Sequence, residues 1–199
     1  MYTWRKLTPN EQSALLASRL ATHRPWHSPP HQFPQGTHRF FITAACYEHV
    51  PIIAHSLERM STFESSLLAL CEEYAQNTFA WCILPNHYHV LVQTDQIKAL
   101  LISLGQLHGR ISHQWNGEDH TRGRKVWHNS VERAIRSDRH FWASLNYTHH
   151  NPVKHGYVER WQDWPWSSAS AYLEHIGREA AQHIWKTYPV LDYGKTWDL

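Results

Sequence analysis

The stretch TFAWCILPNHYHVLVQ, residues 78–93, decides the fold of this chain. Its two halves, Thr78–Leu84 and His87–Gln93, are rich in β-branched and aromatic residues, as strands are. Pro85 and Asn86 stand between the halves and are typical of a turn. The stretch therefore predicts two consecutive strands joined by a short connection.

The segments that precede and follow this pair extend the pattern. The run HRFFITAACY predicts a buried strand over His38–Tyr47. Apolar residues at spacings of three and four predict a helix over Met60–Tyr74, and Ser61 and Glu64 have the spacing of a capping box at its start. The same spacing predicts a second helix over Gln96–Trp115.

The remaining core elements are expected after a polar, glycine-containing loop over Asn116–Arg124. Val126–Ile135 predicts a fourth strand and Ser137–His150 a further helix. That helix is expected to end at or just before Asn151, because Pro152 follows. The order strand, helix, strand, strand, helix, strand predicts an α+β fold of the ferredoxin-like type, a two-layer sandwich of an antiparallel sheet with helices on one face.

The pattern divides the chain into three segments. Four prolines crowd the end of residues 1–36, which are expected to form a proline-rich extension. Residues 37–158 hold the predicted core, and residues 159–199 form a helical, tryptophan-rich C-terminal appendage that packs on it or flanks it. A length of 199 residues suits one domain with these additions.

Composition narrows the class of protein. With 42% hydrophobic and 18% charged residues, the chain has the composition of a globular protein and not of a disordered one. Its longest apolar run, Phe40–Cys46, is too short to span a bilayer, and its first residues do not form a secretory signal. Cys46, Cys71 and Cys82 are odd in number and lie among apolar neighbours, which indicates buried, reduced thiols in a cytoplasmic protein.

Positive charge is concentrated in residues 105–160, which hold nine Lys/Arg against five Asp/Glu. Trp127 and Trp142 lie within this block. Cations neutralise phosphates and aromatic rings stack on unpaired bases, so the block predicts a nucleic-acid-binding surface. A solvated basic face over core tryptophans is the alternative. The candidate DNA-binding residues are Arg122, Arg124, Lys125, Arg133, Arg136, Arg139 and Lys154.

His87 and His89 are two apart on a predicted strand, so both rings project from the same face and could hold one metal ion. The chain contains 18 histidines, and at that content about 1.6 His-x-His patterns arise by chance. The spacing therefore needs support from other residues. Tyr147 and Asn151 provide it, because they are four apart and share a helix face if the helix reaches that far.

A tyrosine beside a metal-bound phosphodiester suggests one kind of reaction. The tyrosine hydroxyl is a weak nucleophile near neutral pH, since its ordinary pKa is about 10. A divalent ion polarises the phosphoryl oxygen and helps to stabilise the departing 3′-hydroxyl. Attack by Tyr147 would then leave a covalent phosphotyrosine, which conserves the bond energy for a later rejoining step.

Three motifs, in this order along the chain, resemble those of the single-tyrosine HUH transposases. LPNHYHVLV, residues 84–92, is similar to their histidine–hydrophobe–histidine strand. YTHHNPVKHG, residues 147–156, is similar to their tyrosine helix. WPWSS, residues 164–168, with the following Tyr172, is similar to the tail of one branch, the REP-associated tyrosine transposases.

The resemblance implies a ferredoxin-like domain that cleaves and rejoins single-stranded DNA at hairpins through a 5′-phosphotyrosine intermediate. It implies that Tyr147 is the nucleophile. It also implies a magnesium or manganese ion held by His87, His89 and Asn151, and two nitrogen ligands suit manganese somewhat better. By the same resemblance we expect a monomer that works in cis, with a dimer left open.

Two roles and two other functions stay open at this point. His150 is adjacent to Asn151 and could replace it as the third ligand, and either His149 or a metal-bound water could be the general acid. A non-catalytic single-strand-binding module would use the same basic and aromatic surface without needing Tyr147. A hydrolase of small phosphoesters would need neither the basic block nor the tail.

Overall fold

The computed structural model describes residues 8–21, 36–191 and 193. Gln35–Gly194 form one compact unit, and helix α2 (Pro9–Ala21) belongs to another and is described by itself. Thr8 and Glu11 form a capping box at the start of α2, in which the backbone N–H of Thr8 donates to Glu11 Oε2 at 2.7 Å. The extension predicted over residues 1–36 thus contains a helix that the sequence reading missed, while its proline cluster lies outside the described residues.

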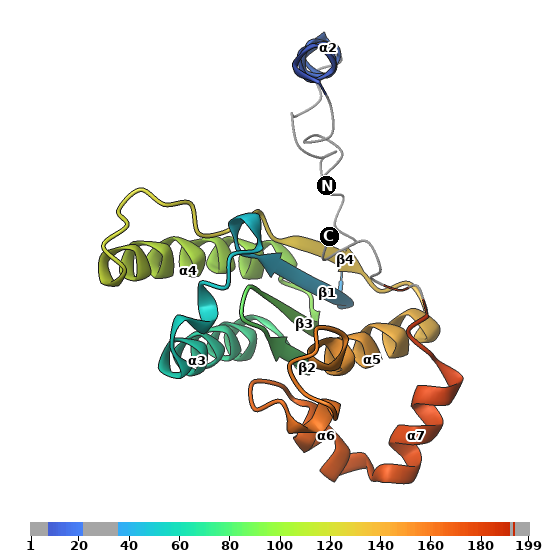
Figure 1. Cartoon of the computed structure of the whole chain (residues 1–199). Coiled ribbons are helices and arrows are strands. Elements are labelled where there is room, and N and C mark those ends of the chain that lie inside the picture. Colours follow the sequence, from blue (N-terminus) through green and yellow to red (C-terminus); the bar gives the residue numbers. More distant parts are fainter. Residues whose placement is uncertain (1–7, 22–35, 192, 194–199) are drawn as a thin grey trace. The chain divides into compact units, whose positions relative to one another are not determined.

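The sheet contains four strands: β1 (His38–Ala45), β2 (Asn77–Ile83), β3 (His87–Thr94) and β4 (Val131–Ala134). Their spatial order is β2-β3-β1-β4, and every pairing is antiparallel. This order and the alternation of strands and helices along the chain confirm the ferredoxin-like prediction (Figure 1). Two short 3₁₀ turns, η1 (Tyr47–His49) and η2 (Ile53–His55), follow β1.

Helices α3 (Leu57–Tyr74) and α4 (Ile97–Glu118) pack together against one face of the sheet. Tyr88 of β3 lies fully buried on this face, and its ring contacts Phe63 of α3 at 5.3 Å between centroids. Its hydroxyl lies 3.2 Å from His108 Nε2 on α4. Burial lowers the pKa of His108 to about 4, so the ring is neutral near pH 7 and its nitrogen can accept this hydrogen bond.

Helix α5 (Asp138–Lys154) packs on β2 and β3. Side chains alternate along a strand, so His87 and His89 project from the face of β3 opposite to Tyr88. Tyr147 of α5 contacts Phe41 and His89 on that face, which places α5 on the side of the sheet away from α3 and α4. The sheet is therefore covered on both sides, by the two predicted helices on one face and by α5 on the other.

The predicted capping box at the start of α3 is wrong. The helix begins at Leu57, and its N-cap is Ser56, whose hydroxyl accepts from the backbone N–H of Arg59 at 3.1 Å. Ser61 lies inside the helix and donates to the carbonyl of Leu57, while Glu64 accepts a hydrogen bond from the Trp81 indole at 2.8 Å. The two predicted cap residues thus serve other contacts.

Two boundaries around α4 also differ from expectation. The helix runs to Glu118, so the first three residues of the predicted loop over Asn116–Arg124 belong to the helix. The predicted fourth strand over Val126–Ile135 is shorter, because only Val131–Ala134 pair continuously with β1. Trp127, nearer its start, forms a single isolated bridge with Cys46 instead.

The predicted end of the tyrosine helix is wrong as well. Helix α5 continues through Asn151 and Pro152 to Lys154. Proline removes only its own N–H bond here, and the last turn is closed by other backbone bonds, from Tyr157 N–H to the Pro152 carbonyl at 2.9 Å and from His155 N–H to the Asn151 carbonyl at 3.1 Å. Because the helix continues, Asn151 lies one turn beyond Tyr147 on the same face.

The C-terminal segment adds a 3₁₀ turn, η3 (Trp161–Asp163), and two helices, α6 (Ala169–Ile176) and α7 (Arg178–Thr187). Residues of the WPWSS motif lie along β2: the Ile83 N–H donates to the Trp166 carbonyl at 2.8 Å, and Ser168 N–H donates to the Trp81 carbonyl at 3.1 Å. The motif thereby pairs with the outer edge of the sheet.

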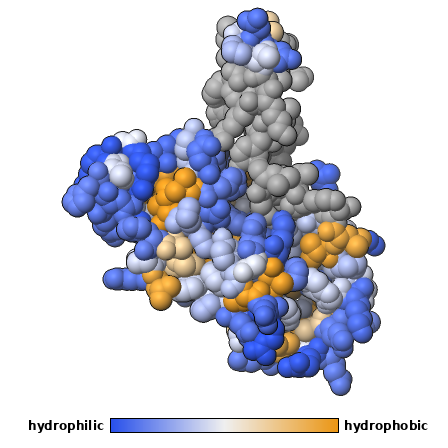
Figure 2. Space-filling model, viewed as in Figure 1, coloured by the Kyte–Doolittle hydropathy of each residue, from blue (hydrophilic) through white to orange (hydrophobic). Residues whose placement is uncertain are grey.

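The predictions about cysteines are confirmed for the thiols themselves: Cys46, Cys71 and Cys82 are buried and form no disulfide. Burial raises the pKa of Cys71 to about 11 and of Cys46 to about 12, which makes these thiols unreactive. The described helices include none long and apolar enough for a membrane span. On the face drawn in Figure 2, apolar residues form separate patches within a hydrophilic surface.

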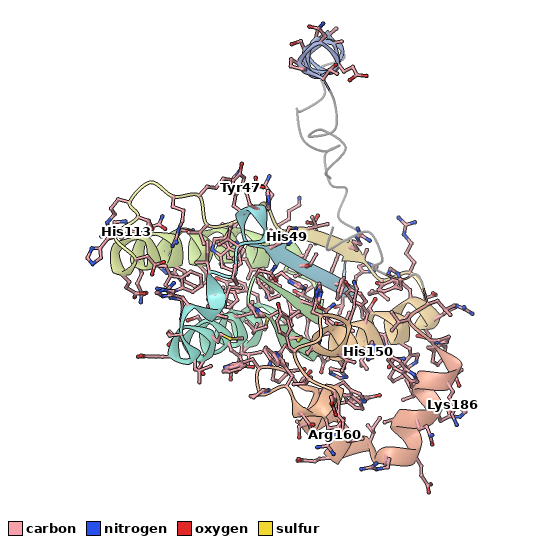
Figure 3. The ribbon with its side chains drawn as sticks, viewed as in Figure 1. Tyr47, His49, His113, His150, Arg160 and Lys186 are labelled. Atoms are coloured by element: carbon pink, nitrogen blue, oxygen red, sulfur yellow. The ribbon has the colours of Figure 1, made fainter. Side chains whose placement is uncertain are left out.

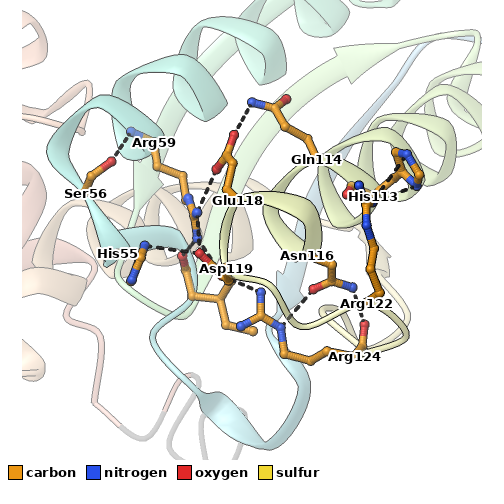
Figure 4. Close-up of polar contacts among 11 residues, drawn as sticks. His55, Ser56, Arg59, His113, Gln114, Asn116, Glu118, Asp119, Arg122 and Arg124 are labelled. Atoms are coloured by element: carbon orange, nitrogen blue, oxygen red, sulfur yellow. Dashed lines mark hydrogen bonds and ion pairs between the residues drawn. The ribbon is translucent and has the colours of Figure 1, made fainter.

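A buried ion-pair cluster ties α3 to the end of α4 (Figure 4). Arg59 is 6% exposed and donates to Asp119 at 2.8 and 3.2 Å and to Glu118 at 2.7 Å. Arg124 donates to the same Asp119 carboxylate at 2.6 Å, and His55 lies 3.3 Å from it. Hydrogen bonding to Arg59 and then to Arg124 holds the pKa of Asp119 well below its ordinary value.

We predict that Asp119→Asn destabilises the fold by about 2–3 kcal/mol, because the buried Arg59 loses a bidentate partner but keeps Glu118. A group with a depressed pKa stabilises the folded state above its ordinary pKa, near 4, and that contribution is lost as the pH falls below it. Urea unfolding at pH 7 and at pH 3 should therefore show a smaller loss on acidification in the variant. Asp163→Asn, which breaks only the exposed pair with Arg160, is the control and should cost under about 1 kcal/mol; equal costs for both variants would contradict the prediction.

Candidate active site

β3 and α5 bring four of the predicted residues together. The rings of His87 and His89 lie 5.0 Å apart between centroids, and that of Tyr147 lies 5.2 Å from His89. Asn151 places its side-chain oxygen 3.1 Å from His87 Nε2. All four side chains are at most 2% exposed. The histidine pair and the tyrosine helix, predicted separately, thus form one site.

The turn residue Asn86 fixes the orientation of His87. Its side-chain amide donates to the carbonyl of His49 at 3.0 Å, which leaves its oxygen to face His87 Nδ1 at 2.7 Å. An amide oxygen only accepts, so Nδ1 of His87 carries the hydrogen. In the neutral ring the lone pair then belongs to Nε2, the atom that faces Asn151.

This arrangement fits a divalent cation. Nε2 of His87 and Oδ1 of Asn151 lie 3.1 Å apart and each carries a lone pair, so a cation between them would meet two donor atoms. Ligands in adjacent octahedral positions about 2.1 Å from a metal ion lie about 3.0 Å apart, close to this spacing. Among the described residues no three His, Cys, Asp or Glu side chains form a metal-binding group.

Four residues that the sequence reading did not assign complete the site. Phe41 of β1 stacks on His89 at 5.3 Å with an angle of 17° between the rings. The ring centroid of His155 lies 5.1 Å from that of His87, and the ring centroid of Tyr193 lies 5.6 Å from that of Tyr147. His155 follows Asn151 by four residues, a spacing that would have indicated it if the helix had been expected to pass Pro152. Asn86 was assigned only a place in the turn.

The two alternative histidines lie elsewhere. His149 is buried, donates or accepts a hydrogen bond with Ser168 at 2.9 Å, and stacks on Trp161. Burial lowers its pKa to about 3, so it is neutral near pH 7 and is unsuited to protonate a leaving group as the general acid. His150 lies against Trp185 of α7 at 4.9 Å, so Asn151 and not His150 faces His87.

The comparisons with known proteins identify the family. No family model matches the chain. A REP-associated tyrosine transposase from Haemophilus influenzae is 34% identical over 119 residues, which make up 55% of this chain and 68% of that protein. This chain belongs to the REP-associated tyrosine transposase family. Its fold also resembles that of a REP-associated tyrosine transposase solved in complex with a REP hairpin, with a TM-score of 0.54 and 20% identity over 71% of this chain and 81% of that one.

In this family member the predicted basic residues divide into two groups. Lys154 and Arg133 lie at the site. Lys154 Nζ is 3.4 Å from the Tyr147 hydroxyl oxygen. Arg133 of β4 lies opposite Phe41 of β1 in the sheet register. The others lie away from Tyr147 or have local partners. Arg124 is bound to Asp119, and Arg122 donates to the His113 carbonyl at 2.7 Å.

The other three candidates are exposed. Lys125 lies over the ring of Tyr47 at 4.6 Å, at the start of η1. Arg136 and Arg139 flank the first turn of α5. Their cations are available to solvent, and hence to phosphates, in a way that the ion-paired Arg124 is not.

We predict that His149→Phe flattens the pH dependence of stability. The folded chain keeps His149 neutral, whereas the unfolded chain protonates it below about pH 6.5, so its contribution to stability falls as the pH drops from about 6.5 toward 3. One such group changes the unfolding free energy by about 1.4 kcal/mol per pH unit. Urea unfolding between pH 7 and pH 5 measures the slope. His183→Phe, at an exposed position of α7, should keep the wild-type slope; an unchanged slope in His149→Phe would show that this ring titrates normally.

Proposed function

We propose that this transposase cleaves and rejoins single-stranded DNA beside hairpins, with Tyr147 as the nucleophile and a divalent metal ion at His87, His89 and Asn151. The observation that carries the proposal is the placement of the Tyr147 ring 5.2 Å from His89 and of Asn151 beside His87, on two different elements. Hairpin DNA is the proposed substrate, and it is supported by a solved structure of similar fold that is bound to a REP hairpin.

The reaction follows from the chemistry of the site. The Tyr147 oxygen attacks a backbone phosphorus, a bond forms between that oxygen and the 5′-phosphate, and the bond to the 3′-oxygen breaks. The departing 3′-oxygen takes up a proton. A 3′-hydroxyl of the same or another strand can later attack the phosphotyrosine, which restores Tyr147 and joins the strands.

The chain's own residues prepare these steps. The Lys154 ammonium donates to the Tyr147 oxygen and stabilises negative charge there as the hydroxyl proton leaves. Asn86 holds His87 with Nε2 toward the metal position, and Phe41 fixes the plane of the His89 ring. A bound divalent ion would polarise the phosphoryl oxygen as a Lewis acid. Two imidazole donors favour manganese over magnesium.

The competing function is a non-catalytic single-strand-binding module on the same scaffold. The exposed cations Lys125, Arg136 and Arg139 would serve such a module equally well. What favours the enzyme is the buried Tyr147, because a binding module has no need of a phenol held beside two histidines and a lysine.

We predict that Tyr147→Phe binds hairpin DNA within about threefold of the wild-type affinity but forms no covalent protein–DNA band. Phenylalanine preserves the ring contacts to Phe41 and His89 and removes only the attacking oxygen. Incubation with hairpin DNA and Mn²⁺, followed by a denaturing gel, measures the adduct. Tyr74→Phe, at the end of α3 on the other face of the sheet, is the matched control and should keep it. An adduct that survives in Tyr147→Phe would exclude this nucleophile, and a wild-type protein that binds but never forms an adduct would favour the binding module.

We predict a graded loss of Mn²⁺ affinity across the site. His87→Ala or Asn151→Ala should abolish Mn²⁺ binding in calorimetry and DNA cleavage together, because each removes a donor. Asn86→Ala keeps every donor but releases the His87 ring, so the affinity should fall about 10- to 100-fold. His183→Ala, at an exposed position of α7, is the control. Wild-type affinity in His87→Ala would place the metal elsewhere.

A further inference from the structure

A cavity of about 420 Å³ lies between α5, η3, α6 and α7, and Tyr147 is not among its lining residues. It falls in the size range of sites for small organic ligands. His149 and His150 of α5 are among the residues that line it. Figure 3 shows His150 on the side of α5 toward the C-terminal helices, consistent with its contact to Trp185 of α7. The proposed chemistry at Tyr147 does not use this cavity.

The walls of the cavity are flat and aromatic. His149 and Trp161 are stacked, with ring centroids 5.7 Å apart and an angle of 12° between the rings, and Tyr172 lies 4.9 Å from His149. His150 and Trp185 form a second aromatic pair at 4.9 Å. These rings give the cavity flat surfaces on which another ring can stack.

Polar groups at the cavity need a ligand with polar edges. The Tyr172 hydroxyl oxygen is buried and finds no hydrogen-bond partner among the described residues, although a buried hydroxyl normally has one. Arg178 lines the cavity from the exposed start of α7 and places a cation at its rim. A flat ring would stack on the aromatic walls, its polar edge would bond the Tyr172 hydroxyl, and an adjacent negative charge would meet Arg178. A nucleotide has this chemistry.

We infer that this cavity binds one unpaired nucleobase of the DNA strand that reaches Tyr147, and that Arg178 contacts a phosphate beside that base. The inference rests on the proposed function, since it takes the ligand from the same DNA. Tyr147 and the two wall histidines lie on different sides of one helix, which is about 10 Å across. A stacked strand advances about 3.4 Å per nucleotide and has to pass around the helix, so the bound base is at least about three nucleotides from the attacked phosphate. The cavity would thus select where along the strand cleavage occurs.

The test is an abasic scan with the full-length chain. A hairpin oligonucleotide with a single-stranded flank is made with each flank base removed in turn, and the dissociation constant is measured by fluorescence anisotropy with EDTA present. In the wild type, removal of one base should weaken binding about 5- to 100-fold, the range expected for a base stacked on aromatic rings. Trp185→Ala should weaken binding to the intact DNA by a similar factor and should no longer respond to that abasic site. Trp185→Phe should restore most of the response.

The charge at the rim has its own matched pair of variants. Arg178→Gln should reduce the slope of log affinity against log salt by about 0.7, the value for one phosphate contact on a single strand. Lys186→Gln removes an equal charge from α7 at an exposed residue that does not line the cavity and should leave the slope unchanged. Thermal unfolding of each variant confirms that the fold persists.

The outcomes separate this inference from the proposed function. If the wild type forms the Tyr147 adduct but Trp185→Ala keeps wild-type affinity at every abasic position, the cavity does not bind a base and the proposed function stands. If the wild type neither binds hairpin DNA nor forms an adduct, the proposed function itself fails. A uniform loss of affinity in Trp185→Ala with an unchanged abasic pattern would assign Trp185 to packing and would overturn the inference.

Discussion

The two-residue period of β3 is the constraint on which the rest of the structure depends. It turns Tyr88 toward α3 and α4, where the ring packs on Phe63, and turns His87 and His89 toward α5. A slip of one residue in register would turn Tyr88 toward α5 and the two histidines toward α3 and α4. The hydrophobic packing of Tyr88 therefore also holds the histidine pair in place, so that the core and the site are positioned by the same pairing of β3 with β1 and β2.

The turn before β3 links folding to chemistry in a second way. Asn86 lies in the turn between β2 and β3, and its amide is anchored on the His49 carbonyl in η1. Because this contact decides which atom of the amide faces His87, a local turn determines which nitrogen of His87 carries a lone pair. If the turn changed, the His87 ring would lose the contact that orients it, even with every proposed ligand present.

The sequence predicted those features that depend on short-range periodicity, and missed those that depend on distant contacts. The strands follow from their β-branched and aromatic residues, their order from the alternation of strands and helices, and the His87–His89 pair from a period of two. The rule that a helix ends before proline failed at Asn151, because burial of Tyr147 and Asn151 in the site favours one more turn. Ser61 and Glu64 have the full spacing of a capping box, but Ser56 is the residue that caps the helix. Charge density along the chain could not show that Arg124 is neutralised by Asp119.

Two of the 18 histidines, His108 and His149, serve as buried packing residues in the part of the chain that the structure describes. His108 stacks on Trp127 at 4.3 Å with an angle of 14°, and His149 stacks in the same way on Trp161. Burial holds the pKa of both well below the usual value, so each acts as a flat neutral ring with a polar edge, bonded to Tyr88 and to Ser168 respectively. Phenylalanine could fill the same space but could not satisfy those hydroxyls. On α5 this gives a helix with two different sides, where Tyr147 and Asn151 face the histidine pair and the rings of His149 and His150 line a cavity of different chemistry.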